Sequence, residues 1–191
     1  MTVNDKKEAT KIARLLKEGK IIIYPTDTIW GIGCDATNAE AVDKIAEIKQ
    51  REAGKSMLLL ADHISLVERY TKTVPDAARN IAEVTVEPIT IIYPDAQNLP
   101  ENVIAEDGSI GIRVSNDAFC KLIIEQLDRP IISTSANFSG EKHPDSFSDI
   151  SQKLIERVDY TANYRRNEKI KSKPSGIIKV TASNEVSIIR S

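Results

Sequence analysis

Apolar residues recur along this chain at two spacings that alternate from one end to the other. Spacings of three and four positions, as in Ala9, Ile12, Ala13 and Leu16, are typical of amphipathic helices. They predict helices over residues 5–18, 39–49, 63–70, 76–84, 116–127 and 146–157. Short apolar runs, several of them next to glycine or proline, predict strands over residues 21–24, 57–60, 89–93, 109–114, 130–133, 177–180 and 186–189. The alternation predicts an α/β fold with helices flanking a twisted mixed sheet.

Polar segments over residues 25–33, 96–107 and 160–172 are predicted to be loops. No internal repeat or composition break divides the chain, so residues 1–191 are expected to form a single domain. The formal net charge is −2, which removes a bulk basic field as an argument for nucleic acid, although a local basic concavity could still bind phosphates. No signal-peptide pattern and no membrane-length apolar run is visible, so a cytoplasmic protein is expected.

Cysteine and histidine positions argue against a metal centre. Cys34 and Cys120 lie far apart and form no CxxC pair, which favours buried reduced thiols over a zinc site or a disulfide. His63 and His143 are also far apart and are predicted to lie on the surface. No residue is therefore predicted to be a metal ligand.

The first candidate for chemistry is the segment Thr26-Asp27-Thr28, which follows the predicted strand 21–24. Ligands of α/β sheets bind in crevices at strand ends, and Gly31 and Gly33 would let the backbone approach a ligand closely. A turn held by its own hydroxyl and carboxylate side chains would explain the same residues. The pattern alone leaves both interpretations open.

A second candidate is the group of cations Lys49, Arg51 and Lys55 at the end of the predicted helix 39–49. Bidentate arginine with lysine suits a triphosphate. The alternative is a solvated last turn, where the helix dipole favours cations. The sequence contains no GxxxxGK[ST] motif, so a P-loop is excluded.

Two further candidates follow later strands. The run from Ser133 to Gly140 offers hydroxyls and the Asn137 amide to phosphate or ribose oxygens, or else caps a helix. Ser135 is not in a GxSxG motif, which disfavours a serine hydrolase. Arg113 in the strand 109–114 is costly to bury unless it meets an anion such as a substrate carboxylate; the alternative is an edge strand facing water.

Four segments, in this order, resemble the YrdC-like family of threonylcarbamoyl-AMP synthases. They are Pro25-Thr26-Asp27-Thr28-Ile29-Trp30-Gly31-Ile32-Gly33, Lys49-Gln50-Arg51 with Lys55, Gly108-Ser109-Ile110-Gly111-Ile112-Arg113-Val114 and Ser133-Thr134-Ser135-Ala136-Asn137-Phe138-Ser139-Gly140. The resemblance covers about residues 6–190 and implies the short form, without the extra C-terminal domain of longer members. It implies a YrdC-like fold with an open concave cavity.

The resemblance also implies a reaction in which L-threonine, bicarbonate (or CO₂) and ATP give threonylcarbamoyl-AMP and pyrophosphate, for t6A modification of tRNA by downstream transferase machinery. It implies ATP contacts by Lys49, Arg51, Lys55, Ser109, Ser133, Ser135, Asn137 and Arg190, and threonine contacts by Thr28, Arg113 and Ser175. Mg²⁺ would be held through the ATP phosphates. Some members of the family are reported to bind RNA, so a non-catalytic RNA-binding module is the alternative.

The chain departs from the family pattern in places. Trp30 replaces a tyrosine, Ser56-Met57 replaces Pro-Leu, Leu60 replaces a histidine found in some members, and Gly176 replaces a threonine. These changes bear on threonine specificity more than on ATP binding. A carbamoyl-phosphate enzyme of the same family is disfavoured because such chains are much longer and carry zinc fingers.

Overall fold

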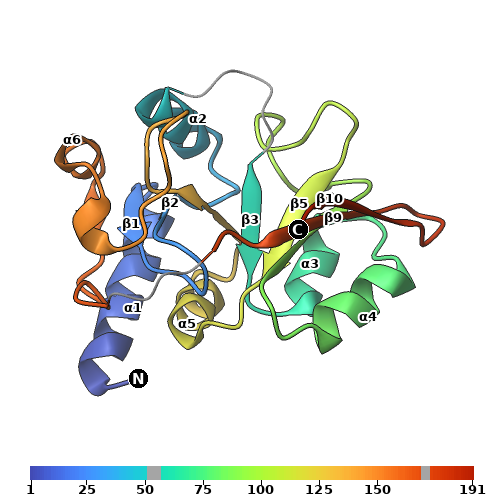
Figure 1. Ribbon diagram of the computed structural model, residues 1–191, viewed down its shortest axis with the longest axis horizontal. Helices are drawn as coiled ribbons and strands as arrows, with labels where there is room; N and C mark the ends of the chain where they lie inside the picture. Colours follow the sequence, from blue (N-terminus) through green and yellow to red (C-terminus); the bar gives the residue numbers. More distant parts are fainter. Residues whose placement is uncertain (51–56, 169–172) are drawn as a thin grey trace.

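The computed structural model describes residues 1–50, 57–168 and 173–191, which form helices packed on two sheets (Figure 1). The helices are α1 (Val3–Lys17), α2 (Ala39–Lys49), α3 (Ile64–Tyr70), α4 (Asp76–Val84), α5 (Ala118–Leu127) and α6 (Gln152–Ile155), with a 3-10 helix η1 (Phe147–Asp149). The strands are β1 (Ile22–Tyr24), β2 (Gly31–Gly33), β3 (Leu58–Ala61), β4 (Ile89–Tyr93), β5 (Ile110–Val114), β6 (Ile131–Ile132), β7 (Thr134–Ser135), β8 (Tyr160–Thr161), β9 (Gly176–Val180) and β10 (Val186–Arg190).

The first five predicted helices are confirmed, with ends shifted by no more than two residues. α1 begins in a capping box, in which the Thr2 hydroxyl accepts from the Asp5 amide and the Asp5 carboxylate accepts from the Thr2 amide. The predicted helix 146–157 is wrong as one element. Ser146 and Asp149 close a single 3-10 turn by the same reciprocal bonding, and the chain is extended at Ile150 before α6 begins.

The strands divide between two sheets where the sequence pattern suggested one. A six-stranded mixed sheet has the order β10-β9-β4-β5-β3-β6, with β3–β5 and β4–β9 parallel and the other pairs antiparallel. A four-stranded sheet has the order β7-β2-β1-β8. α3 and α4 pack on the larger sheet, and α1 packs along α5 (Figure 1). The predicted α/β class with flanking helices and mixed strand directions is confirmed.

Three of the observed strands, β2, β7 and β8, lie in segments that were predicted to be loops or hydroxyl-rich runs. β2 pairs antiparallel with β1 and with β7, and β8 pairs with β1. The loop prediction for residues 25–33 is wrong at its end, because Gly31–Gly33 form β2. Glycine is needed at position 33, since a Cβ there would stand 2.1 Å from the carbonyl oxygen of Ile132. Gly33 therefore allows the backbone at Ile132 to approach closely, and the glycine serves packing within the protein.

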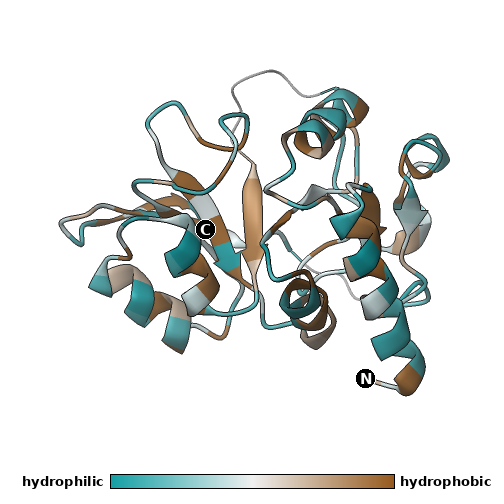
Figure 2. Cartoon of the chain, turned by 180° about the vertical axis from the view of Figure 1, so that it is seen from behind, coloured by the Kyte–Doolittle hydropathy of each residue, from teal (hydrophilic) through white to brown (hydrophobic). Residues whose placement is uncertain are grey.

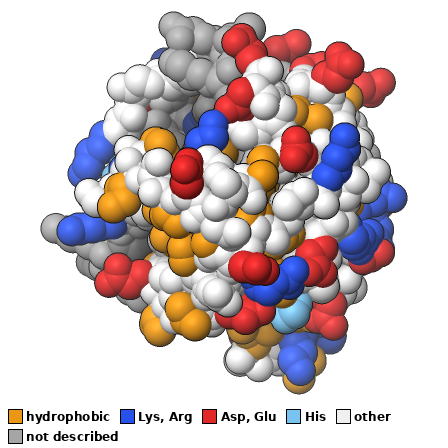
Figure 3. Space-filling view, turned by 90° about the vertical axis from the view of Figure 1, so that its right-hand side faces the viewer, with side chains coloured by type: hydrophobic (Ala, Val, Ile, Leu, Met, Phe, Trp, Pro, Cys, Tyr) orange, Lys and Arg blue, Asp and Glu red, His pale blue; other side chains and the backbone are white. Residues whose placement is uncertain are grey.

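The core lies between the sheets and their helices, where hydrophobic colour concentrates on strands and on inward helix faces (Figure 2). Apolar side chains also gather on one outer face (Figure 3). Large apolar side chains that are exposed among the described residues include those of Val84, Val86, Ile188 and Ile189. Within the described ranges, no helix has the length and apolar character needed to cross a membrane.

We expect Gly33→Ala to lower the free energy of unfolding by about 3 kcal/mol, because the added methyl group forces two backbones apart. Urea denaturation followed by circular dichroism measures this loss. The matched control is Gly111→Ala, whose nearest new neighbour, Thr90 Cγ2, is 3.5 Å away, and it should unfold close to the wild-type midpoint. Equal midpoints for both variants would contradict the close pairing at Gly33.

Candidate functional site

A cavity of about 380 Å³ lies where the two sheets meet. The turn after β1, strand β2 and strand β7 form one wall, and β3, β4, β5, β9 and β10 contribute to the other. The polar side chains in its described lining are those of Thr26, Thr28, Thr90, Arg113, Ser133, Thr134, Ser135, Asn137, Glu141, His143, Ser175 and Arg190. Hydroxyls and neutral amides outnumber charges, so the cavity suits a ligand rich in oxygen.

The Thr26–Thr28 turn is both a local turn and a wall of this cavity. The Thr26 hydroxyl accepts from the Thr28 amide at 3.0 Å and donates to the Ile29 carbonyl at 2.8 Å. Because that hydroxyl has only one proton, the 3.0 Å contact between the two threonine hydroxyls is donated by Thr28. Each hydroxyl therefore has a fixed direction, and Thr28 Oγ1 keeps its lone pairs for a further donor.

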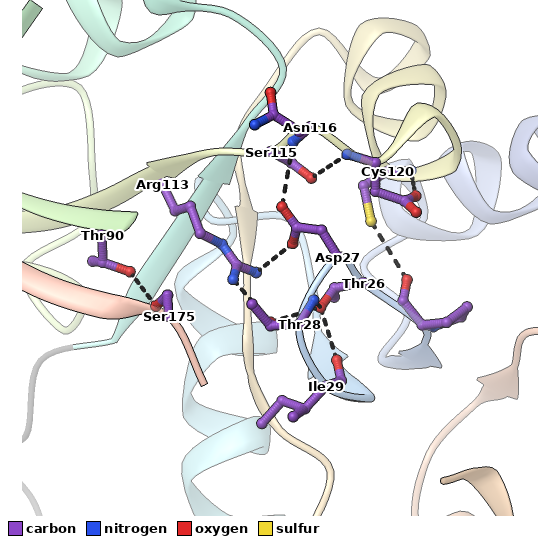
Figure 4. A network of polar contacts seen from close by, with 12 residues as sticks. Thr26, Asp27, Thr28, Ile29, Thr90, Arg113, Ser115, Asn116, Cys120 and Ser175 are labelled. Carbon is purple, nitrogen blue, oxygen red and sulfur yellow. Dashed lines mark hydrogen bonds and ion pairs between the residues drawn. The ribbon is translucent and has the colours of Figure 1, made fainter. Parts of the chain in front are cut away.

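Arg113 supplies that donor from β5 (Figure 4). Its Nη1 lies 2.8 Å from Thr28 Oγ1, and its Nη2 lies 3.1 Å from the Asp27 carboxylate as an ion pair. Only 2% of Arg113 is exposed, and β5 runs between β4 and β3, so the alternative of an edge-strand arginine is wrong. Its Nε is buried and has no hydrogen-bond partner among the described residues.

The run after β6 also faces the cavity. Its backbone is fixed by hydrogen bonds, since the Ser133 amide donates to the Leu58 carbonyl and the Ala136 amide donates to the Trp30 carbonyl. The side chains of Ser133, Ser135 and Asn137 line the cavity. β7 follows, so the alternative of a helix cap is wrong. Asn137 Nδ2 donates to two carbonyls, and its buried Oδ1 has no partner in the described chain.

The C-terminal strands close another side. The hydroxyls of Thr90 and Ser175 lie 2.7 Å apart across β4 and the start of β9. Arg190, at the end of β10, donates through Nε and Nη2 to the Ser175 carbonyl at 3.2 and 2.7 Å. Both predicted residues, Ser175 and Arg190, thus line the cavity. Thr90 was missed because a single threonine in an apolar strand carries no sequence signal.

Two predicted ATP contacts are placed elsewhere. Lys49 is buried, and its Nζ donates to the carbonyls of Ser135 and Asn137 at 2.5 and 2.6 Å, so it anchors the run that walls the cavity. The Ser109 hydroxyl donates to Asp107 Oδ1 at 2.5 Å. Neither residue belongs to the lining of the cavity as described. Arg51 and Lys55 lie outside the described residues, so their predicted phosphate contacts stay predictions.

Burial determines which other groups can react. Burial raises the pKa of the Cys34 thiol, and likewise that of Cys120, so both stay protonated at neutral pH as the sequence suggested. His63 caps α3 through its Nδ1 and is exposed, as predicted. His143 was also predicted to lie on the surface; its side chain is half-buried and lines the cavity.

Two arginines of the loop that follows β8 are paired within the protein. Arg165 Nη1 lies 2.8 Å from the Asp117 carboxylate, and its Nε lies 2.5 Å from Glu168. Arg166 donates to the carbonyls of Thr161 and Ala162, and its guanidinium lies over the Phe147 ring. These two arginines therefore hold the loop after β8 against the protein.

Comparisons with known proteins identify a family and named relatives. The model of the Sua5/YciO/YrdC family, described as "Telomere recombination", matches residues 14–191. The chain is 32% identical to the threonylcarbamoyl-AMP synthase of Pseudoalteromonas translucida over 76% of this chain and 79% of that protein. It is 33% identical to a putative threonylcarbamoyl-AMP synthase of Methanocaldococcus jannaschii over 96% of this chain and 87% of that protein.

Solved structures share the fold. E. coli YciO has a TM-score of 0.83 at 23% identity and covers 97% of this chain and 89% of its own. P. abyssi Sua5, complexed with L-threonine, has a TM-score of 0.79 at 22% identity over 92% of this chain and 51% of that one. The family match over most of the sequence and the identities above 30% show that this chain belongs to the Sua5/YciO/YrdC family.

Proposed function

We propose that this protein is a threonylcarbamoyl-AMP synthase, a nucleotidyltransferase that uses L-threonine, bicarbonate and ATP. Its relatives carry that name, and a solved member of the same fold binds L-threonine. The observation that carries the proposal is the buried guanidinium of Arg113, which reaches a cavity walled by hydroxyls and keeps Nε without a partner in the described chain. A carboxylate would satisfy this donor.

Thr28 and Arg113 then form the threonine site together with Ser175. Arg113 contributes its remaining N–H groups to the amino-acid carboxylate, while Asp27 keeps the guanidinium oriented at 3.1 Å. Asn137 Oδ1, which has no partner among the described residues, is proposed to accept from a hydroxyl or an amine of the substrates. Such a site positions reactants and neutralises charge. These are the needs of a reaction that forms a carbamoyl adenylate without a covalent enzyme intermediate.

In the proposed reaction the threonine amine and bicarbonate form a carbamate and water. A carbamate oxygen attacks the α-phosphorus of ATP, the bond to the β-phosphate oxygen breaks, and pyrophosphate leaves. Ser133, Ser135 and Arg190 provide donors to the nucleotide from the cavity wall. Arg51 and Lys55 are proposed to bind the phosphates from a segment outside the described residues.

Mg²⁺ is proposed to arrive on the ATP phosphates. Among the described residues no group of three or more histidine, cysteine, aspartate or glutamate side chains could hold a metal ion, and the cavity offers mainly hydroxyl and amide groups. That donor set fits phosphate oxygens and metal-bound water better than a bare ion. Mg²⁺ would supply charge neutralisation at the leaving pyrophosphate.

The product is proposed to serve t6A modification of tRNA through a downstream transferase. Because that modification uses ATP and tRNA, we propose a cytoplasmic location. A non-catalytic RNA-binding role is the second candidate. The internal pairing of Arg165 and Arg166 disfavours it, because these guanidinium groups are already occupied. Tight RNA binding that weakens with salt, without nucleotide turnover, would favour it.

Purified protein supplied with ATP, Mg²⁺, L-threonine and bicarbonate is expected to release pyrophosphate. A coupled phosphate assay measures the rate, and mass spectrometry identifies the threonylcarbamoyl adenylate. Omission of any one substrate should abolish release. No pyrophosphate from the complete mixture would refute the proposed function.

Thr28→Val is expected to raise the KM for threonine roughly 5- to 150-fold, because it leaves Arg113 Nη1 without its acceptor inside the protein. Steady-state pyrophosphate release against threonine concentration measures the change. Thr28→Ser keeps the hydroxyl and is the matched control, with a KM within about threefold of wild type. If both variants bind threonine like the wild type, Thr28 does not belong to the threonine site.

A further inference from the structure

His143 is the one histidine of two in the chain that lies in the cavity. Its side chain is 30% exposed, yet its Nδ1 is buried and makes no hydrogen bond with any described residue. A buried ring nitrogen without a partner is uncommon in folded proteins and calls for an explanation. The position therefore differs from that of His63, which uses its Nδ1 to cap α3.

A carboxylate stands beside this nitrogen. Asp145 Oδ1 lies 3.7 Å from His143 Nδ1, and Asp145 Oδ2 is held by Lys142 at 2.8 Å. The spacing is longer than a hydrogen bond, but such contacts are often long before substrate binds and shorten afterwards. Because Nδ1 faces the carboxylate, Nε2 on the opposite edge of the ring is the nitrogen left for the cavity.

We propose that His143 accepts the proton that threonine must lose before its nitrogen can attack bicarbonate, with Asp145 as the positioning residue behind it. The inference rests on the proposed function and adds a proton acceptor to it. Histidine is the side chain most often used as a general base, and a carboxylate behind the ring can orient it.

The step balances as follows. Threonine enters as an ammonium ion and transfers one proton to Nε2, which leaves a neutral amine and an imidazolium. The amine lone pair forms a C–N bond to the bicarbonate carbon, the C–OH bond breaks, and the departing hydroxyl takes the second amine proton and leaves as water. The carbamate carries the negative charge forward, and the imidazolium later returns its proton to solvent.

Three other charged side chains belong to the described lining. Glu141 is exposed, and its Oε2 accepts from the Phe138 amide at 3.2 Å in its own turn. Arg113 and Arg190 are cations and cannot accept a proton at neutral pH. His143 differs from all three, because its buried ring nitrogen has no partner among the described residues and has a carboxylate behind it.

The test compares His143→Gln, which keeps a polar side chain but cannot take the proton, with His63→Asn, which keeps an N-cap acceptor on α3. At pH 7, His143→Gln should lower kcat for pyrophosphate release roughly 10²- to 10⁴-fold, while His63→Asn stays near wild type. The deficit should shrink as the pH rises from 7 towards 9, because a growing share of free threonine has lost its ammonium proton in solution. An unchanged Kd for ATP and an unchanged Tm exclude a folding defect.

A second measurement uses the fact that the chain has two histidines. Imidazole NMR signals of the wild-type protein with a non-hydrolysable ATP analogue should show the His143 signal moving when threonine is added and the His63 signal unmoved. A His143→Gln variant within threefold of wild-type kcat at pH 7, or a His143 signal indifferent to threonine, overturns the inference. If the wild type itself releases no pyrophosphate, the proposed function fails first, and the NMR titration still decides whether His143 meets threonine.

Discussion

The cavity depends on a guanidinium group that the fold takes out of water. Arg113 belongs to the six-stranded sheet, whereas Asp27 and Thr28 follow β1 of the four-stranded sheet. Desolvation of a cation is costly unless opposite charge and hydrogen bonds replace the water, so these contacts hold the two sheets in one relative position at the site. One donor of this buried guanidinium, Nε, still has no partner among the described residues. A substrate anion would supply the missing acceptor.

The rest of the wall is held by its backbone. β7 pairs with β2, Lys49 binds the carbonyls of Ser135 and Asn137, and Gly33 lets the backbone at Ile132 come close. These bonds use backbone groups and a lysine, and they fix the run of Ser133, Thr134 and Ser135 in the lining of the cavity. A preorganised wall of neutral donors loses little entropy when it binds oxygen atoms of a substrate.

Sequence reasoning succeeded where a local pattern reflects a local cause. Helical spacing located α2 and α5, and the cost of burying Arg113 pointed to an anion site. It failed for β2 and β7, since strands of two or three residues carry too few side chains for a period to be read. The sequence could not locate the contacts of Lys49 or the position of His143 for a different reason. The carbonyls that Lys49 binds lie more than 80 positions away, and the cavity that His143 lines is assembled from distant segments.

The buried groups beneath the site explain why so few side chains can take part in proton transfer. Burial raises the pKa of Tyr24 and of Cys120, whose thiol contacts the Pro25 carbonyl at 3.4 Å, so both remain neutral across the physiological range. Neutral neighbours add no charge that would compete with Asp27 for Arg113. The guanidinium can therefore fix the carboxylate end of an amino acid while its ammonium end meets a separate acceptor, and this separation is what a zwitterionic substrate requires.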